Sequence, residues 1–288
     1  MAVNFSENQL NFARKKFYGK FYVTKSRLNF FDKLLNKILR INYQLKYSIL
    51  NIKRKIFSLF FFSFKNKLNK KIVNFSLNLD DISIHKYSED LKKNNFTFIE
   101  NFLSKETYEY ICNNWPNINY FNHNKMIHKH YSSRKIWSIK HKFSKFKDPY
   151  NLKLYFDYIL SNEFRKFYQS LVKFENKDYE IYAISSAMAP KNSFLIPHVD
   201  NIINNKENLT NYNFIYFLDG YDENPIFGGG TGFYKDNEFK EPIFTPPTIK
   251  NSLLIYNQCR DFYHGYRLID CPKNIIRKSI NFQIRAKE

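Results

Sequence analysis

Cysteine and glycine are both scarce in this sequence, which has 3 cysteines and 7 glycines among 288 residues. Cys112, Cys259 and Cys271 show neither the spacing of a metal site nor that of a disulfide framework. We therefore expect a reducing, cytosolic environment. The most apolar run, residues 56–64, is too short to span a bilayer and is flanked by lysines. The first 25 residues contain no continuous apolar core, so no secretory leader is expected.

Acidic residues are almost absent from the first quarter of the chain. Residues 1–76 carry 17 Lys or Arg against two acids, which gives +15 of the total net charge of +20. Residues 77–288 carry 29 basic against 24 acidic residues, which leaves +5. The change in composition predicts a basic, helical N-terminal extension over residues 1–95 and a second domain over residues 96–288.

A long helix is predicted over residues 26–72, because apolar residues recur every three or four positions while lysines and arginines occupy the other face. No proline or glycine interrupts residues 21–115. Packing on the rest of the chain or on a protein partner, and binding to an anionic membrane surface, both fit this pattern. A cytoplasmic protein, peripheral to a membrane, follows from the second alternative. Nucleic acid is the least favoured partner, because basic charge is present without a recognised binding module.

The hydrophobic period changes to two from residue 179 onward, which predicts β-structure. Eight short strands separated by turn signals are predicted at residues 179–187, 193–203, 211–219, 228–234, 239–246, 251–257, 261–269 and 275–284. Upstream, residues 97–112 predict a strand followed by a helix capped by Ser104, and residues 150–173 predict another helix. The expected fold is α+β, mainly β, with a double-stranded β-helix (jelly roll) core, flanking helices and the basic helical extension.

The segment Pro197-His198-Val199-Asp200 lies in the second of these strands. Because strand residues alternate between faces, His198 and Asp200 are expected on the same face. An imidazole beside a carboxylate makes two thirds of the 2-His-1-carboxylate triad that suits non-haem Fe(II), and His264 is the natural third ligand. A second histidine pair, His128 and His130, is less favoured because basic residues surround it and no carboxylate lies near it in the sequence.

These motifs together resemble the Fe(II)/2-oxoglutarate-dependent dioxygenases, in their prolyl 4-hydroxylase-like branch. The resemblance covers about residues 95–286 and rests on an ordered set of six features. They are Asn-Phe-Leu-Ser at 101–104, His-x-Asp at 198–200, Tyr-Phe-Leu-Asp at 216–219, Gly-Gly-Gly-Thr at 228–231, His264, and Arg-x-Ser at 277–279.

The resemblance implies that His198, Asp200 and His264 bind Fe(II), and that Arg277 and Ser279 hold the distal carboxylate of 2-oxoglutarate. Alternation places Arg277 and Ser279 on one face of the last strand. A guanidinium also offers a carboxylate a rigid fork of donors.

Two further positions bear on the co-substrate. Arg267 competes with Arg277, but it lies three residues from His264 and on the opposite face of that strand, so Arg277 is preferred. Phe217 stands where many relatives have a tyrosine whose hydroxyl binds the co-substrate. Asn213, on the same face of that strand, is the expected substitute.

The activity that the resemblance implies is oxidative decarboxylation of 2-oxoglutarate to succinate and CO2, coupled to hydroxylation of a second substrate. Ascorbate is a candidate reductant, and no catalytic residue is expected beyond the metal centre. Peptidyl, amino-acid, glycan and small-molecule substrates all stay open, as do desaturation and cyclisation. The alternatives are a non-catalytic, cupin-like binding protein and another metal-dependent jelly-roll enzyme that does not use 2-oxoglutarate, and neither would need Arg277.

Overall fold

The computed structural model describes residues 74–115, 122–123, 135–140, 150–189, 195–198, 211–219, 228–235, 241–258, 263–267, 269 and 276–286, together with residues 45, 49 and 52. Its helices are α3 (Asp81–Asn94), α4 (Lys105–Asn113), α5 (Tyr150–Ile159), α6 (Asn162–Leu171) and the 3-10 turn η6 (Lys173–Glu175). Its strands are β1 (Phe96–Ile99), β2 (Asn122–His123), β3 (Lys135–Lys140), β4 (Tyr179–Ala189), β5 (Leu195–His198), β6 (Asn211–Asp219), β7 (Gly232–Tyr234), β8 (Pro242–Phe244), β9 (Ser252–Asn257), β10 (Tyr263–Tyr266) and β11 (Arg277–Ala286).

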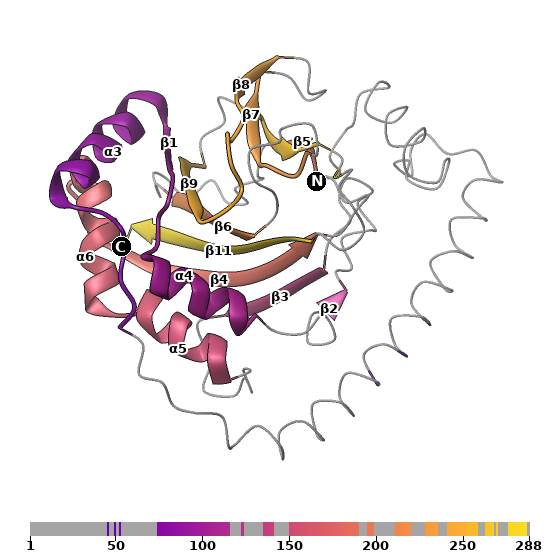
Figure 1. The fold of residues 1–288 in the computed structure, drawn as a ribbon. Coiled ribbons are helices and arrows are strands. Elements are labelled where there is room, and N and C mark those ends of the chain that lie inside the picture. The colour runs from indigo at the N-terminus through magenta and orange to yellow at the C-terminus, as the bar shows by residue number, and fades with distance from the viewer. Residues whose placement is uncertain are drawn as a thin grey trace.

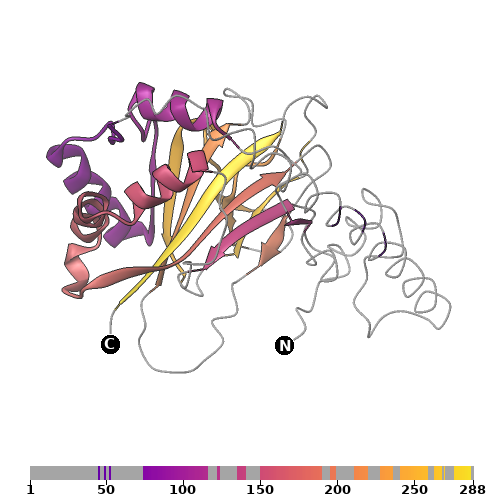
Figure 2. The same ribbon diagram turned by 90° about the horizontal axis from the view of Figure 1, so that it is seen from below.

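The strands form two antiparallel sheets. The large sheet has the order β1-β9-β6-β11-β4-β3-β2, and the small sheet has the order β5-β10-β7-β8. Figure 1 shows the small sheet above the large one, with the helices to the left and below. In Figure 2 the same helices, in purple and pink, lie together on one side of the strands. Strands β4 to β11 are distributed between the two sheets as a jelly roll requires.

All eight strands predicted from the period of two are present, as β4 to β11. Their ends differ, most of all in β5, which is described only from Leu195 to His198. Asp200 and residues 201–203 of the predicted strand are outside the described residues. The structure is thus α+β with mostly strands, as expected.

One face of the large sheet packs against the helices. It carries alternate residues of β6 and β11, among them Phe214 and Phe282, whose rings stack with centroids 4.5 Å apart. Phe164 of α6 meets Phe282 edge-on at 5.4 Å. Burying each such ring contributes about 1.5–3 kcal/mol, so this face holds the helices on the sheet.

The residues that precede β1 belong to the same packed unit. Leu91 of α3 is buried in the helix-facing core, and Ser88 donates a hydrogen bond to the carbonyl of Leu171 at 2.8 Å. Leu77 forms a β-bridge with Leu103. The packed unit therefore includes α3 and starts N-terminal to residue 96, where the second domain was predicted to begin.

The helix predicted over residues 150–173 is divided into α5 and α6. Ser161 caps α6, and its hydroxyl accepts a hydrogen bond from the backbone N–H of Phe164 at 3.2 Å. A side-chain cap satisfies a helix N-terminus and thereby starts a new helix. Ser104 caps α4 as predicted, by accepting from the N–H of Thr107 at 3.3 Å.

The start of β9 is joined to the segment before α4 by Asn251, which has a φ of 45°. Its side-chain amide accepts from the N–H of Leu103 at 3.0 Å and donates to the Leu103 carbonyl at 2.9 Å. The Tyr216 hydroxyl also donates to it at 3.0 Å, and burial raises the pKa of Tyr216 well above its usual range, so the donor keeps its proton. The amide thus satisfies the backbone N–H and carbonyl of Leu103, as a neighbouring strand on that side would.

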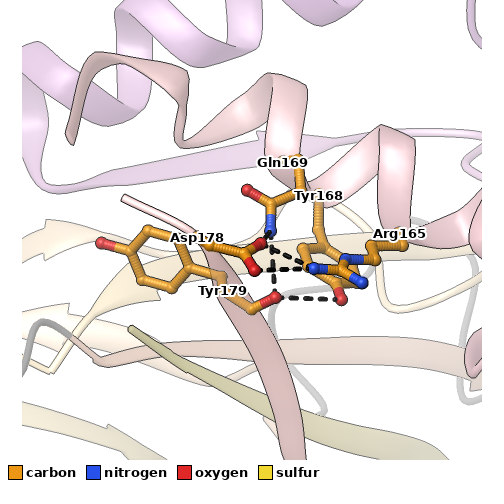
Figure 3. A network of polar contacts seen from close by, with 5 residues as sticks. All are labelled: Arg165, Tyr168, Gln169, Asp178 and Tyr179. Atoms are coloured by element: carbon orange, nitrogen blue, oxygen red, sulfur yellow. Dashed lines mark hydrogen bonds and ion pairs between the residues drawn. The ribbon is translucent and has the colours of Figure 1, made fainter. Parts of the chain in front are cut away.

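A polar network joins α6 to the start of β4 (Figure 3). Arg165 donates to both carboxylate oxygens of Asp178, at 2.7 and 2.8 Å. Gln169 donates to Asp178 at 2.6 Å and to the carbonyl of Tyr179 at 2.9 Å. These groups are exposed, so the network orients the connection more than it stabilises the fold.

Most of the predicted N-terminal helix, residues 26–72, lies outside the described part of the chain, as do His128 and His130. Within that range Leu45, Ile49 and Ile52 are described, and all three are helical and exposed. Among the described residues no helix is both long and apolar enough to cross a membrane.

Candidate metal and co-substrate site

The two histidines of the predicted metal site lie on neighbouring strands. His264 of β10 is directly opposite His198 of β5 in the antiparallel pair. The imidazole of His264 is buried, with its ring centroid 5.3 Å from that of Tyr256 in the large sheet. His264 therefore points into the space between the two sheets. The side chain of His198 is not among the described ones.

The close approach of β5 and β10 depends on Gly265. A Cβ at this position would lie 2.5 Å from the carbonyl oxygen of Leu195 and 2.8 Å from the nitrogen of Pro197. The register shifts beyond the histidine pair, so that Tyr266 is opposite Leu195. Proline has no N–H to donate, and it is tolerated here because β5 is an edge strand with an irregular register. Gly265 thus permits the pairing that sets His264 opposite His198.

Arg277 is the most buried charged residue of the described site, at 2% exposure. Its guanidinium donates to the hydroxyl of Ser279 at 3.4 Å and to that of Thr231 at 3.2 Å. The guanidinium carbon lies 4.6 Å from the ring centroid of Tyr266 and 5.1 Å from that of Phe217. Contacts of this kind compensate part of the cost of burying a cation.

We call the five residues Arg277, Ser279, Thr231, Tyr266 and Phe217 the Arg277 cluster. Arg277, Ser279 and Phe217 come from the large sheet, Tyr266 from the small sheet, and Thr231 directly precedes β7 of the small sheet. The Arg277 cluster therefore joins the two sheets of the jelly roll. A guanidinium flanked by hydroxyl donors is suited to a carboxylate, so these residues fit the distal end of a 2-oxo dicarboxylic acid.

The competing arginine is placed differently. Arg267 is exposed, whereas Arg277 is buried on the inner face, the side of the large sheet that faces the small one. The alternation predicted for β11 is present, because Ile280 and Phe282 belong to the helix-facing core and Ser279 contacts Arg277. The preference for Arg277 over Arg267 agrees with this burial.

Asn213 lies apart from the Arg277 cluster. The register pairs Phe217 with Ser279, whereas Asn213 pairs with Gln283 and Tyr256. Four residues of strand separate Asn213 from Phe217, which is about 13 Å along β6. Asn213 instead donates to the Tyr256 hydroxyl at 2.6 Å, close to His264. Its predicted role as a substitute for a hydroxyl at Phe217 does not fit this position.

Sequence reasoning missed Thr231, Tyr266 and Tyr256. Thr231 closes the Gly-Gly-Gly-Thr motif, and Tyr266 lies two residues after His264, so alternation puts it on the same face. The alternation from His264 was therefore a signal in the sequence that could have identified Tyr266. Nothing in the sequence indicates that Tyr256 lies beside His264, because the two residues belong to different sheets.

A complete metal site cannot be assembled from the described residues, among which no group of three or more His, Cys, Asp or Glu is suitably close. The residues present nevertheless fit the predicted group. The backbone register, which sets His264 opposite His198, is the one that two ligands of one ion would require.

No model of a known protein family matches the sequence, and no curated protein matches it either. Solved structures match in fold. A prolyl-4-hydroxylase from Pseudomonas putida is 12% identical, with a TM-score of 0.50 over 71% of this chain and 99% of that one. A 2OG-Fe(II) oxygenase family oxidoreductase from Burkholderia pseudomallei is 11% identical, with a TM-score of 0.50 over 73% and 93%.

A third match is a prolyl hydroxylase from Trichoplax adhaerens, in complex with a peptide fragment of the hypoxia inducible factor oxygen degradation domain. It is 17% identical, with a TM-score of 0.51 over 71% of this chain and 89% of that one. All three chains are covered almost completely. The protein therefore has the fold of the 2OG-Fe(II) oxygenases, in its prolyl 4-hydroxylase-like form.

Proposed function

We propose that the protein is an Fe(II)- and 2-oxoglutarate-dependent dioxygenase. The observation that carries the proposal is the Arg277 cluster, in which a buried guanidinium and two hydroxyls lie on the inner face of a jelly roll. A buried cation is costly to maintain in a protein interior, so it favours a site that binds an anion. A binding module without turnover has less need for it.

His198, Asp200 and His264 are the proposed Fe(II) ligands. The register of His198 with His264 supports this assignment, and the period of two along an extended segment would bring Asp200 to the same side. Bound there, Fe(II) would supply the activation of dioxygen that couples loss of CO2 from 2-oxoglutarate to oxidation of a second substrate.

The proposed task of the protein's own residues is to bind and orient the co-substrate. Arg277 and Ser279 would hold the distal carboxylate of 2-oxoglutarate and so direct its 2-oxo acid end toward His264. Aromatic contacts close the neighbouring part of the jelly roll, where Phe233 lies 4.9 Å from Phe96 and 6.1 Å from Phe244 between ring centroids. A close-packed aromatic wall excludes water, which strengthens the electrostatic interactions inside.

The prime substrate is proposed to be hydroxylated, with peptidyl, amino-acid, glycan and small-molecule classes all open. The Trichoplax protein was solved with a peptide, which makes a peptide the first class to test. Ascorbate is proposed as the reductant.

The basic N-terminal extension is proposed to bind an anionic membrane surface or a protein partner, on the strength of its charge and of the exposed helical residues Leu45, Ile49 and Ile52. Loss of liposome binding after deletion of residues 1–73 would identify the membrane as that partner.

The deciding experiment starts without oxygen. Fe(II) and then 2-oxoglutarate are added to the purified chain, and we expect a weak visible absorption band. Air is then admitted, and we expect slow formation of succinate even without a prime substrate. A folded protein that shows neither the band nor succinate contradicts the proposal and favours the non-catalytic, cupin-like alternative.

Asp200→Ala is the matched variant for this experiment. We expect it to lose Fe(II) binding and succinate formation while its thermal unfolding stays close to that of the wild type. Succinate formation that persists in Asp200→Ala contradicts the ligand assignment.

A further inference from the structure

We propose that Tyr266 supplies the hydroxyl that binds the distal carboxylate of the co-substrate together with Arg277, in place of the hydroxyl that Phe217 lacks. This inference rests on the proposed function and names a residue that the resemblance does not assign. Tyr266 is completely buried, and its hydroxyl has no hydrogen-bond partner among the described residues. Burying a hydroxyl without a partner costs free energy, which a bound carboxylate would offset.

The position of the Tyr266 ring leads to the same assignment. Tyr266 lies 4.6 Å from the guanidinium carbon of Arg277, and Phe217 lies 5.1 Å from the same carbon. The two rings thus contact one guanidinium from different sheets. A phenol hydroxyl on either ring would lie close to an anion that this guanidinium holds. The sequence has the hydroxyl on the ring of the small sheet and lacks it on the ring of the large sheet.

The spacing along β10 fits a five-carbon dicarboxylate. Tyr266 is two residues from His264, which is about 7 Å along an antiparallel strand. One ligand would therefore be long enough to place its 2-oxo acid end near His264, which would help to hold the metal, and its distal carboxylate at the Arg277 cluster. Thr231 and Ser279, which both contact Arg277, complete the ring of donors.

The donors of the Arg277 cluster come from both sheets, so a bound carboxylate would link the two sheets. Arg277 and Ser279 belong to β11, whereas Tyr266 belongs to β10 and Thr231 directly precedes β7. We therefore expect 2-oxoglutarate to raise the temperature of thermal unfolding, as a ligand that binds only the folded state does. This readout does not depend on turnover.

The test compares Tyr266→Phe with the wild-type chain, both loaded with Fe(II) under anaerobic conditions and titrated calorimetrically. We expect the Kd for 2-oxoglutarate to rise roughly 10- to 100-fold, the range of a lost hydrogen bond to a charged group. 2-Oxopentanoate has the same chain length but no distal carboxylate, and we expect it to bind both proteins equally. Tyr263→Phe, which removes a hydroxyl from the same strand, is the control and should change neither Kd.

A rescue variant distinguishes the loss of a hydrogen bond to the co-substrate from a change in packing around residue 266. In the Tyr266→Phe background, Phe217→Tyr should restore most of the affinity for 2-oxoglutarate and its effect on thermal unfolding. Equal 2-oxoglutarate affinity in the wild type and Tyr266→Phe would overturn the inference and leave the proposed function intact. Equal weakening of 2-oxopentanoate would also overturn it, because the hydroxyl would then act elsewhere. A wild-type chain that does not bind 2-oxoglutarate contradicts the proposed function itself.

Discussion

Strands β6 and β11 bury side chains on both of their faces, and yet the side chains of the two faces differ in kind. The face toward the helices carries Phe214, Tyr216, Ile280 and Phe282, which belong to one hydrophobic core. The inner face carries polar side chains on the same two strands, namely Asn213, Arg277, Ser279 and Asn281. A sheet whose only task was stability would have no need to bury these polar groups, since each requires a partner to offset its desolvation.

The difference indicates a division of tasks between the faces. The helix-facing side is close-packed by rings, for example Phe282 against Phe164 at 5.4 Å, and should determine the free energy of unfolding. The inner side holds a cation, hydroxyls and amides, and should determine ligand affinity. Substitutions on neighbouring positions of one strand should therefore separate stability from binding.

The largest effect on stability is expected from Phe282→Ala on the helix-facing side. Phe282 is completely buried and contacts Phe164 and Phe214, so its truncation leaves a cavity. We expect a loss of about 3–5 kcal/mol in the free energy of unfolding, measured by urea denaturation. A loss below about 1 kcal/mol would contradict the view that this face holds the fold together.

The largest effect on binding is expected from Arg277→Ala on the inner side. Loss of charge-assisted hydrogen bonds worth about 1.5–3 kcal/mol should raise the 2-oxoglutarate concentration needed for half-maximal binding at least about tenfold. Calorimetric titration under anaerobic conditions measures this change. Arg267→Ala is the control, and because Arg267 is exposed it should leave the affinity unchanged. The reverse result would exchange the roles of the two arginines.

The smallest effect is expected from Asn281→Ala, one position before Phe282. The side-chain oxygen of Asn281 is buried without a hydrogen-bond partner among the described residues, so removing it should change the free energy of unfolding by less than about 1 kcal/mol. Urea denaturation beside Phe282→Ala makes the comparison directly. A destabilisation as large as that of Phe282→Ala would erase the distinction between the two faces.

Much of the fold could be predicted from local patterns. The period of two located all eight strands of the jelly roll, and it assigned Arg277 and Ser279 to one face with Ile280 on the other. Ser104 was identified as a helix cap because its hydroxyl can satisfy a backbone N–H within its own turn. Such features depend on residues close together in the chain, which is why the sequence shows them.

The division between α5 and α6 could not be predicted with the same certainty, because the apolar stripe continues across Ser161. The packing of α3 against the sheet was also missed. Ser88 reaches the carbonyl of Leu171, 83 positions away, and nothing near Ser88 in the sequence indicates that partner. Composition instead suggested that the second domain begins after this helix.

The sequence by itself determined which strands form, which residues share a face, and which histidines and arginine are candidates for the site. The tertiary structure decided which residues of different strands lie next to one another. Asn213 contacts Tyr256 and is not paired with Ser279, and the ring of Tyr266 contacts the guanidinium of Arg277. The physical reason is that alternation along one strand needs only local geometry. The register between strands, and the contact between two sheets, follow from packing the whole chain at once.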